Sequence, residues 1–157
     1  MVEAALWVPI LMMFLFGMLE LARVSYTYYT VHKILYTLGR FVGTQQAMNL
    51  CSEDDERVQA AINYALRGGP GENDELILPG LQPDMIEIRI ERRNPESEEL
   101  EECECSDTGC DAAQGGLPPD YIVVRIPDGY PIQLNIPRLL GDPIPLRPVV
   151  RVPYGGT

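Results

Sequence analysis

The chain is poor in positive charge and in histidine. Its 12 Lys and Arg residues stand against 23 Asp and Glu, which gives a formal net charge of −11, and it contains one histidine. Nucleic-acid phosphates are bound by clusters of Lys and Arg, which are absent here. The same acidity disfavours adsorption to anionic lipid headgroups. The composition therefore excludes nucleic acid as an expected partner.

Motifs for catalysis are also missing. The sequence has no G-x-S-x-G and no glycine-rich phosphate loop that leads into a helix, since "RGGPGEN" follows a predicted helix. The one histidine, His32, has no carboxylate at helical spacing to orient it. The many acids show no sign of the desolvation that a proton donor needs. We expect a protein that is not an enzyme and that holds no cofactor and no metal.

Charge is absent from residues 4–19, and no Lys or Arg precedes them. As a helix this run spans about 24 Å, and Leu21 and Ala22 extend it past Glu20 towards the ~20 residues that cross a bilayer. A secretory signal would have a basic leader and a cleavage site of small residues. Pro9 and Gly17 weaken a soluble helix but are tolerated in membrane helices. The run predicts a single membrane-spanning helix.

Glu3 stands at the edge of this apolar run. A carboxylate at that depth is costly unless a cation meets it. The dipole of the first helical turn gives partial relief, and the α-amino group of a neighbouring subunit gives more. Removal of a short basic leader on the cytoplasmic side would explain both the missing basic flank and a free amine near Glu3.

The opening "VEAALWVPILMMFLFGMLELARV" resembles the start of the TadE-like, pilin-related proteins of tight-adherence (Tad) pilus systems. These share a V-E-F/A-A-L start, an early proline and an F-G-x-x-E-x-x-R exit. The resemblance implies a prepilin-like protein that is trimmed by a dedicated peptidase. Its N-terminal helix would pack into a filament or a pilus-assembly complex. The matching positions to which it gives a role in assembly are Glu3, Pro9, Phe16, Gly17, Glu20 and Arg23.

After residue 23 the apolar residues form a stripe that alternates steps of four and three, the spacing of a helix–helix packing seam. Ile34, Phe41 and Met48 widen the stripe on one flank. We expect the helix to continue to near Met48, and the stripe to pack on the chain's own head, on neighbouring helices, or on both. The seam residues are Val24, Tyr28, Val31, Leu35, Leu38 and Val42.

The C-terminal part predicts a short helix followed by a small sheet. The segment 51–69 is expected to have its cap at Ser52 and its stop at Gly68. Residues 85–92 alternate as a strand, 121–136 read as a hairpin that turns at Asp128-Gly129, and 143–152 read as a proline-containing edge strand. We predict three or four mostly antiparallel strands, with one face covering the long helix.

The predicted fold is therefore α+β, with the shape of a pilin-like ladle. A long N-terminal helix occupies residues 1–50, of which 1–23 are the apolar part, and an extracellular head occupies residues 51–157. Within the head, residues 94–119 form an acidic loop with no basic residue among its acids. Its spacing does not match a calcium-binding EF-hand loop, and we expect a solvated segment pinned by disulfides.

Four cysteines beside a membrane segment favour two disulfides formed in an oxidising compartment. Zinc fits less well, because the CxC spacing lacks the usual CxxC pairs and the only histidine is distant. One bridge is expected from the first cysteine to the later cluster, and three connectivities are open. The residues are Cys51, Cys103, Cys105 and Cys110.

Two functions of different class follow. The first is a structural pilin-like subunit, major or minor, that leaves the inner membrane with the help of the pilus assembly machinery and joins identical subunits in a helical filament on the cell surface. The alternative is a single-span membrane protein whose acidic extracellular domain binds a partner or calcium and does not polymerise. Glu3 separates them, because only a filament places a neighbouring cation beside its carboxylate.

Overall fold

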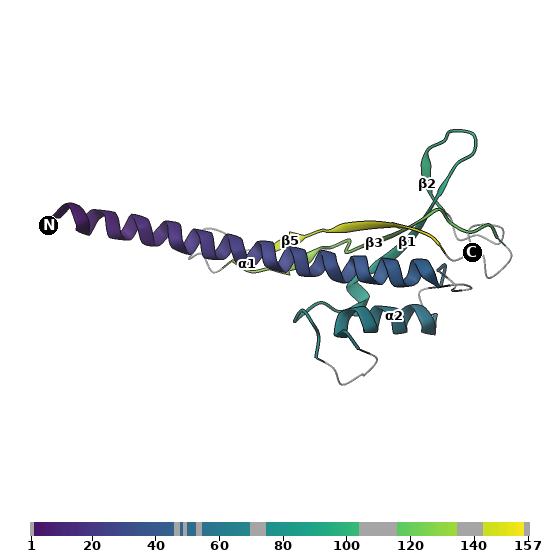
Figure 1. The fold of residues 1–157 in the computed structure, drawn as a ribbon, viewed down its shortest axis with the longest axis horizontal. Helices are drawn as coiled ribbons and strands as arrows, with labels where there is room; N and C mark the ends of the chain where they lie inside the picture. Colours follow the sequence, from purple (N-terminus) through teal and green to yellow (C-terminus); the bar gives the residue numbers. More distant parts are fainter. Residues whose placement is uncertain are drawn as a thin grey trace.

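A long helix with a small head along its C-terminal half makes up the molecule (Figure 1). This computed structural model describes residues 2–45, 48, 50–52, 55–69, 75–103, 116–134 and 143–155, without the side chains of residues 2–6. The described elements are one long helix, one short helix and two small antiparallel sheets. The predicted α+β class is confirmed.

The long helix α1 runs over Val2–Thr44 and contains Pro9. Its 43 residues span about 64 Å at ~1.5 Å per residue. The last turn is closed by the Gln45 N–H, which donates to the Val42 carbonyl at 3.2 Å. The predicted continuation to Met48 is wrong, because the helix ends four residues earlier, although Met48 is itself buried in the core.

The short helix α2 (Glu56–Arg67) lies beside α1. Its N-cap is Asp55, whose carboxylate accepts the Arg57 N–H at 2.8 Å. The predicted cap at Ser52 is wrong, because the Ser52 carbonyl accepts the Asp55 N–H at 3.3 Å in a turn that precedes the helix. Gly68 ends α2 with φ 76°, as predicted, and its N–H donates to the Tyr64 carbonyl at 2.8 Å. The buried face is formed by Val58, Ala61, Ile62, Ala65 and Leu66.

The main sheet has four antiparallel strands in the order β2-β1-β3-β6. A single 3-10 turn, η1 (Pro83–Met85), leads into β1. The antiparallel sheet and the edge position of the last strand are as predicted. β2 was not predicted, because it lies inside the segment expected to be a loop. The strands are β1 (Glu87–Arg93), β2 (Leu100–Glu102), β3 (Tyr121–Arg125) and β6 (Val149–Pro153).

The predicted hairpin across Asp128-Gly129 is wrong in its pairing. A turn forms there, with Gly129 at φ 80°, but β4 (Tyr130–Ile132) pairs with β5 (Ile144–Leu146) in a separate two-stranded sheet. β4 cannot continue beside β3, because β6 occupies that edge of β3 over its whole length. The predicted single final strand is likewise two strands, β5 and β6, which are separated at the buried Pro148.

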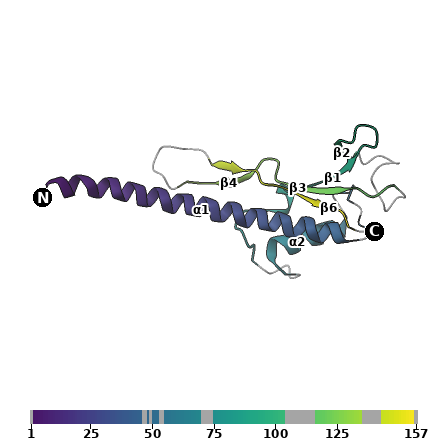
Figure 2. The same cartoon turned by 45° about the horizontal axis from the view of Figure 1, so that its top comes forward.

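The core lies between α1, α2 and one face of the main sheet. Figure 2 shows the sheet over the C-terminal half of α1, with α2 at its side. The sheet contributes two rows in register, one through Ile88, Val124 and Val150 and one through Ile90, Ile122 and Val152. The alternation predicted for β1 is thus confirmed. The core draws on residues from both sides of position 50, since the helix itself supplies several of its largest buried side chains.

Two glycines allow α1 to approach the sheet closely. A Cβ on Gly39 would lie 3.0 Å from Cγ2 of Val152 and 3.3 Å from Cγ2 of Val124. A Cβ on Gly43 would lie 3.2 Å from the backbone oxygen of Pro153. The contact between helix and sheet therefore depends on the absence of side chains at these two positions.

We predict that Gly39→Leu lowers the free energy of unfolding of the head by about 1–3 kcal/mol, because the added side chain has no space between α1 and β6. The measurement is chemical denaturation of the full chain in detergent. Thr37→Leu, two residues away on the exposed side of α1, is the matched control and should change stability by less than about 0.5 kcal/mol. Equal stability of the two variants would contradict the close approach.

Candidate assembly surface

The head does not cover residues 7–19 of α1, and we call these residues the bare segment. Every described side chain from Trp7 to Leu19 is exposed, among them Trp7 at 63%, Phe16 at 66% and Leu19 at 67%. By length and composition the described part of α1 qualifies as a membrane-crossing helix. A continuous apolar surface of this size is unfavourable in water at about 25 cal/mol per Å². Lipid or protein must therefore cover it.

A shallow apolar hollow of about 350 Å³ lies on one side of this bare segment. Gly17 lies in it, and a Cβ placed on Gly17 would meet nothing within 4 Å. Its lining residues recur at intervals of three and four, so they share one side of the helix. A hollow with a glycine among bulky neighbours accepts a side chain from another helix. The lining residues are Ile10, Met13, Phe14, Gly17, Met18 and Leu21.

A carboxylate and a guanidinium mark the end of the apolar run. Glu20 is 17% exposed and its Oε2 lies 4.0 Å from Nη1 of Arg23, which is 53% exposed. The same Oε2 is buried and has no hydrogen-bond partner in the described part of the chain. Glu3 belongs to α1, but its side chain lies outside the described residues. The end of the apolar run thus carries a buried carboxylate oxygen that lies near the Arg23 guanidinium but receives no hydrogen bond from the described residues.

The two-stranded sheet reaches down the helix to this point. The Tyr130 hydroxyl on β4 donates to the Pro79 carbonyl at 2.7 Å. Burial raises the pKa of Tyr130, and the positive charge of Arg23 partly opposes that rise. Arg23 is therefore close enough to β4 to affect it electrostatically, so the head begins where the bare segment ends.

The predicted packing seam divides into two parts. Four of its residues are fully buried in the chain's own core, namely Val31, Leu35, Leu38 and Val42. Val24 is half-buried and Tyr28 is 46% exposed. The head uses the C-terminal part of the stripe, so in this conformation only the N-terminal end of the seam has surface left for another helix.

The outer face of the main sheet carries ion pairs. Glu87 accepts from Arg125 at 2.8 Å and also from Arg89, which in turn pairs with Glu102 on β2. The Arg125 guanidinium lowers the pKa of Glu87, Arg89 lowers it further, and burial opposes both. Glu102 belongs to the run of acids that has no basic residue within it, and its cation comes from the neighbouring strand. Sequence spacing alone does not reveal this partner.

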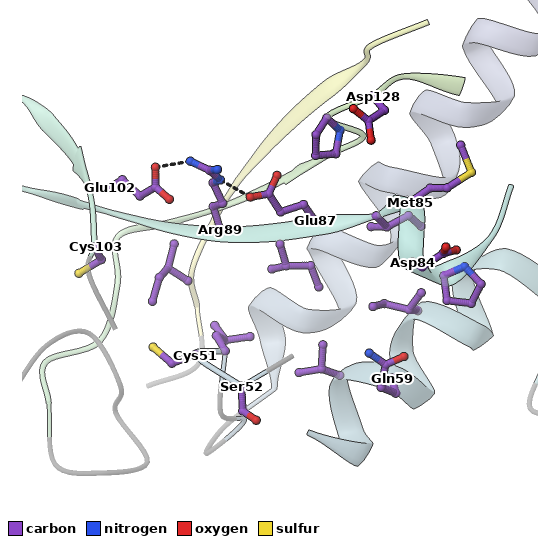
Figure 3. Close-up of a pocket in the computed structure, with 18 residues that line it drawn as sticks. Cys51, Ser52, Gln59, Asp84, Met85, Glu87, Arg89, Glu102, Cys103 and Asp128 are labelled. Atoms are coloured by element: carbon purple, nitrogen blue, oxygen red, sulfur yellow. Dashed lines mark hydrogen bonds and ion pairs between the residues drawn. The ribbon is translucent and has the colours of Figure 1, made fainter. Parts of the chain in front are cut away.

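A groove of about 900 Å³ lies between α2 and β1 (Figure 3). Cys51 and Cys103 both line it, and neither is a free thiol. Cys105 and Cys110 lie outside the described residues, so the pairing of the four cysteines stays a prediction. The described residues contain no group of three side chains arranged to hold a metal ion.

Comparison with known protein families gives a match over most of α1. The family model described as "TadE-like protein" matches residues 1–40. Residues 1–40, which include most of α1, are thus similar to the TadE-like family. This confirms the resemblance seen in the sequence, and the matched range includes all six positions to which the resemblance gives a role in assembly. No curated protein and no solved structure matches the chain.

Sequence reasoning missed two features that shape this surface. Gly39 and Gly43 are four residues apart on α1, a spacing that could have indicated a close approach. The cross-strand pairing of Arg89 with Glu102 depends on β2, which has no recognisable strand pattern.

We predict that the head loses stability as the pH falls below about 4.5, and that Glu87→Gln removes part of this loss. Because the folded-state pKa of Glu87 is lowered, its contribution is fully present above the unfolded pKa and disappears as the pH falls through the folded pKa. Unfolding midpoints between pH 3 and 7 provide the measurement. Glu75→Gln, an exposed carboxylate, is the control and should leave the pH profile unchanged. Superimposable profiles for the Glu87 variant and the wild type would contradict the assignment.

Proposed function

We propose that this chain is a structural, non-catalytic pilin-like subunit that assembles through its apolar N-terminal helix into an extracellular Tad-type filament. The observation that carries the proposal is the bare segment of α1. The head closes its core with helix residues from Val31 onward, so the exposed residues Trp7–Leu19 add nothing to the head. The TadE-like match to residues 1–40 supports a pilus-related role for the same segment.

The proposal gives this surface two successive environments. In the precursor, the inner membrane covers the apolar side chains. In the filament, the corresponding helices of identical subunits cover them. Because lipid tails and aliphatic side chains are similarly apolar, the transfer exposes little apolar surface to water. The assembly machinery would move the subunit from one environment to the other.

Polar groups in the apolar segment favour the filament over a solitary membrane anchor. An anchor needs only apolar side chains, and hydrocarbon offers no partner for a carboxylate. Glu3 lies in α1 near its start, and Glu20 keeps a buried oxygen without a hydrogen bond in the described structure. A neighbouring chain provides donors and cations that lipid tails lack. The hollow beside Gly17 also suits a helix better than mobile acyl chains.

We predict that Glu3→Ala abolishes surface filaments while the subunit still inserts into the membrane and its head still folds. The reason is that the cation of the neighbouring subunit loses the carboxylate that orients it. Electron microscopy and immunoblotting of sheared surface material measure assembly. Glu75→Ala removes a carboxylate from the head and should assemble normally. Filaments of normal number and length from the Glu3 variant would refute the proposal and leave the non-polymerising membrane anchor as the better account.

An extracellular location favours two disulfides among the four cysteines. We predict that exported subunit, analysed by mass spectrometry without reduction, lacks the four thiol hydrogens and resists alkylation. Reduction should lower the stability of the head by about 2–4 kcal/mol for each bridge. Four alkylatable thiols in exported protein would rule out both the bridges and the oxidising compartment.

A further inference from the structure

A row of exposed aromatic and basic side chains follows α1 on the side away from the head. The positions recur at intervals of three and four and so share one side of the helix. Three are tyrosines that are 72%, 67% and 47% exposed, and the other two are exposed cations. We refer to these residues as the Tyr/Lys stripe, which consists of Tyr26, Tyr29, Lys33, Tyr36 and Arg40.

The side chains of the Tyr/Lys stripe take no part in the core or in the ion pairs of the described residues. The core residues of α1, such as Leu35 and Leu38, lie on the opposite side of the helix. Neither Lys33 nor Arg40 forms an ion pair among the residues that the structure describes. Large tyrosine rings beside two such cations make an exposed surface suited to an anionic partner.

The stem, by which we mean residues 21–44 of α1, is positively charged, whereas the head is negatively charged. From Leu21 to Thr44, α1 contains Arg23, Lys33 and Arg40 and no carboxylate. Residues 51–157 contain 21 of the 23 acidic residues and nine of the 12 basic ones, a formal charge of −12. The acidic head of another copy of this chain is therefore a charge complement to the stripe.

We propose that the Tyr/Lys stripe binds the tip of the β1–β2 hairpin of a second copy. The inference rests on the proposed function, because it places a specific contact between filament subunits. The tip is a closed turn in which the Asn94 N–H donates to the Glu99 carbonyl at 2.9 Å and the Glu98 N–H donates to the Asn94 carbonyl at 2.9 Å. Its exposed carboxylates Glu96, Glu98 and Glu99 form no ion pair in the described structure.

The position of the hairpin fits a parallel neighbour that is shifted along the filament. Both views show the β1–β2 hairpin projecting from the sheet, away from α1, at the level of the C-terminal end of the helix (Figures 1 and 2). Arg40 and Lys33 precede Thr44 by four and 11 residues, which is about 6 and 16 Å along the helix. If a second copy is displaced by about 6 to 16 Å along the helix axis, away from the membrane, its Arg40 or Lys33 reaches the level of the hairpin of the first copy. The contact joins the stripe of one copy to the hairpin of the other. Because these surfaces differ and the copies are displaced along the filament, the contact can repeat from subunit to subunit and does not close into a dimer.

An anionic membrane surface fits the stripe less well. Lys33 and Arg40 lie 11 and 18 residues beyond Ala22, about 16 and 27 Å from the end of the apolar run. Attraction between exposed charges is largely screened beyond about 8 Å at physiological salt. The acidic head beside them would also be repelled by anionic headgroups. Lipid is therefore an outcome for the test to exclude.

Lys33 provides a site-specific test, because it is the only lysine in the chain. Filaments grown from a mixture of unlabelled and ¹⁵N-labelled subunits are treated with a carbodiimide, which joins an amine to a carboxylate in direct contact. Mass spectrometry should find Lys33 joined to Glu96, Glu98 or Glu99 in peptides that combine both isotopes. Intact filaments in which Lys33 is linked only within its own chain, to lipid, to another protein or to nothing would overturn the inference.

Charge reversal in the full chain gives a second, independent test. Lys33→Glu with Arg40→Glu should reduce sheared filament at least tenfold, and adding Glu96→Lys, Glu98→Lys and Glu99→Lys should restore most of it. The matched control is Arg57→Glu with Arg147→Glu, which makes the same charge change at exposed positions off the stripe and should assemble normally. Thermal melting of each variant confirms that the head is folded.

The two proposals fail in different ways. If the wild type yields no filament, the proposed function fails. If the wild type and the Lys33/Arg40 variant yield equal filament, the stripe contact fails and the filament stands. If the compensating hairpin changes do not restore assembly, the stripe has another partner, and the second-copy contact is rejected.

Discussion

The packing of the sheet onto one side of the C-terminal half of α1 determines the rest of the structure. Because Gly39 and Gly43 carry no side chain, β6 lies directly on the helix, and Val31, Leu35, Leu38 and Val42 complete a closed core with α2 and the four-stranded sheet. A core that closes at Val31, with only partial cover over residues 20–30, leaves residues 7–19 without a partner in the head. The exposed apolar segment is thus a direct consequence of where the head stops, and the small β4–β5 sheet, which reaches the level of Arg23, marks that boundary.

The bare segment would be ordinary for a membrane anchor if it were only apolar. Its polar groups make it unusual. Pro9 leaves one backbone carbonyl of the preceding turn without its usual donor, Gly17 opens a hollow, and Glu20 buries an oxygen that has no hydrogen bond in the described structure. Each of these three features raises the free energy of the segment when hydrocarbon surrounds it. The cost is smaller when a second helix provides a hydrogen-bond donor or a side chain of complementary shape. The same residues are those that the TadE-like resemblance singles out, and the family match over residues 1–40 covers them all.

The sequence predicted those features whose cause is local. The uncharged run, the cap at Gly68, the alternation of Ile86, Ile88 and Ile90, and the edge position of the last strand all follow from residue type and period. The predictions were wrong where strand pairing depends on which of several distant segments contacts a given strand. The turn at Asp128-Gly129 forms as expected, yet its strands part because β6 is a better partner for β3 than β4 is. β2 was missed because its strand is three residues of mostly acidic character, stabilised by Arg89 across the sheet. The burial of four seam residues by the head could not be separated from packing between subunits, since both use the same period.

Charge separation between stem and head has a further physical consequence. Heads that carry a formal charge of −12 repel one another, so two subunits gain little by joining head to head. The proposed contact would offer each head an attractive basic face on the next subunit, and because it is heterologous it would give an open array with a direction instead of a closed dimer. Ion pairs at exposed positions contribute little affinity, and the apolar helices provide most of it. In the proposed filament, burial of the apolar segment would hold the subunits together, and the stem cations and head carboxylates would select the parallel, displaced arrangement among the many that burial alone would allow.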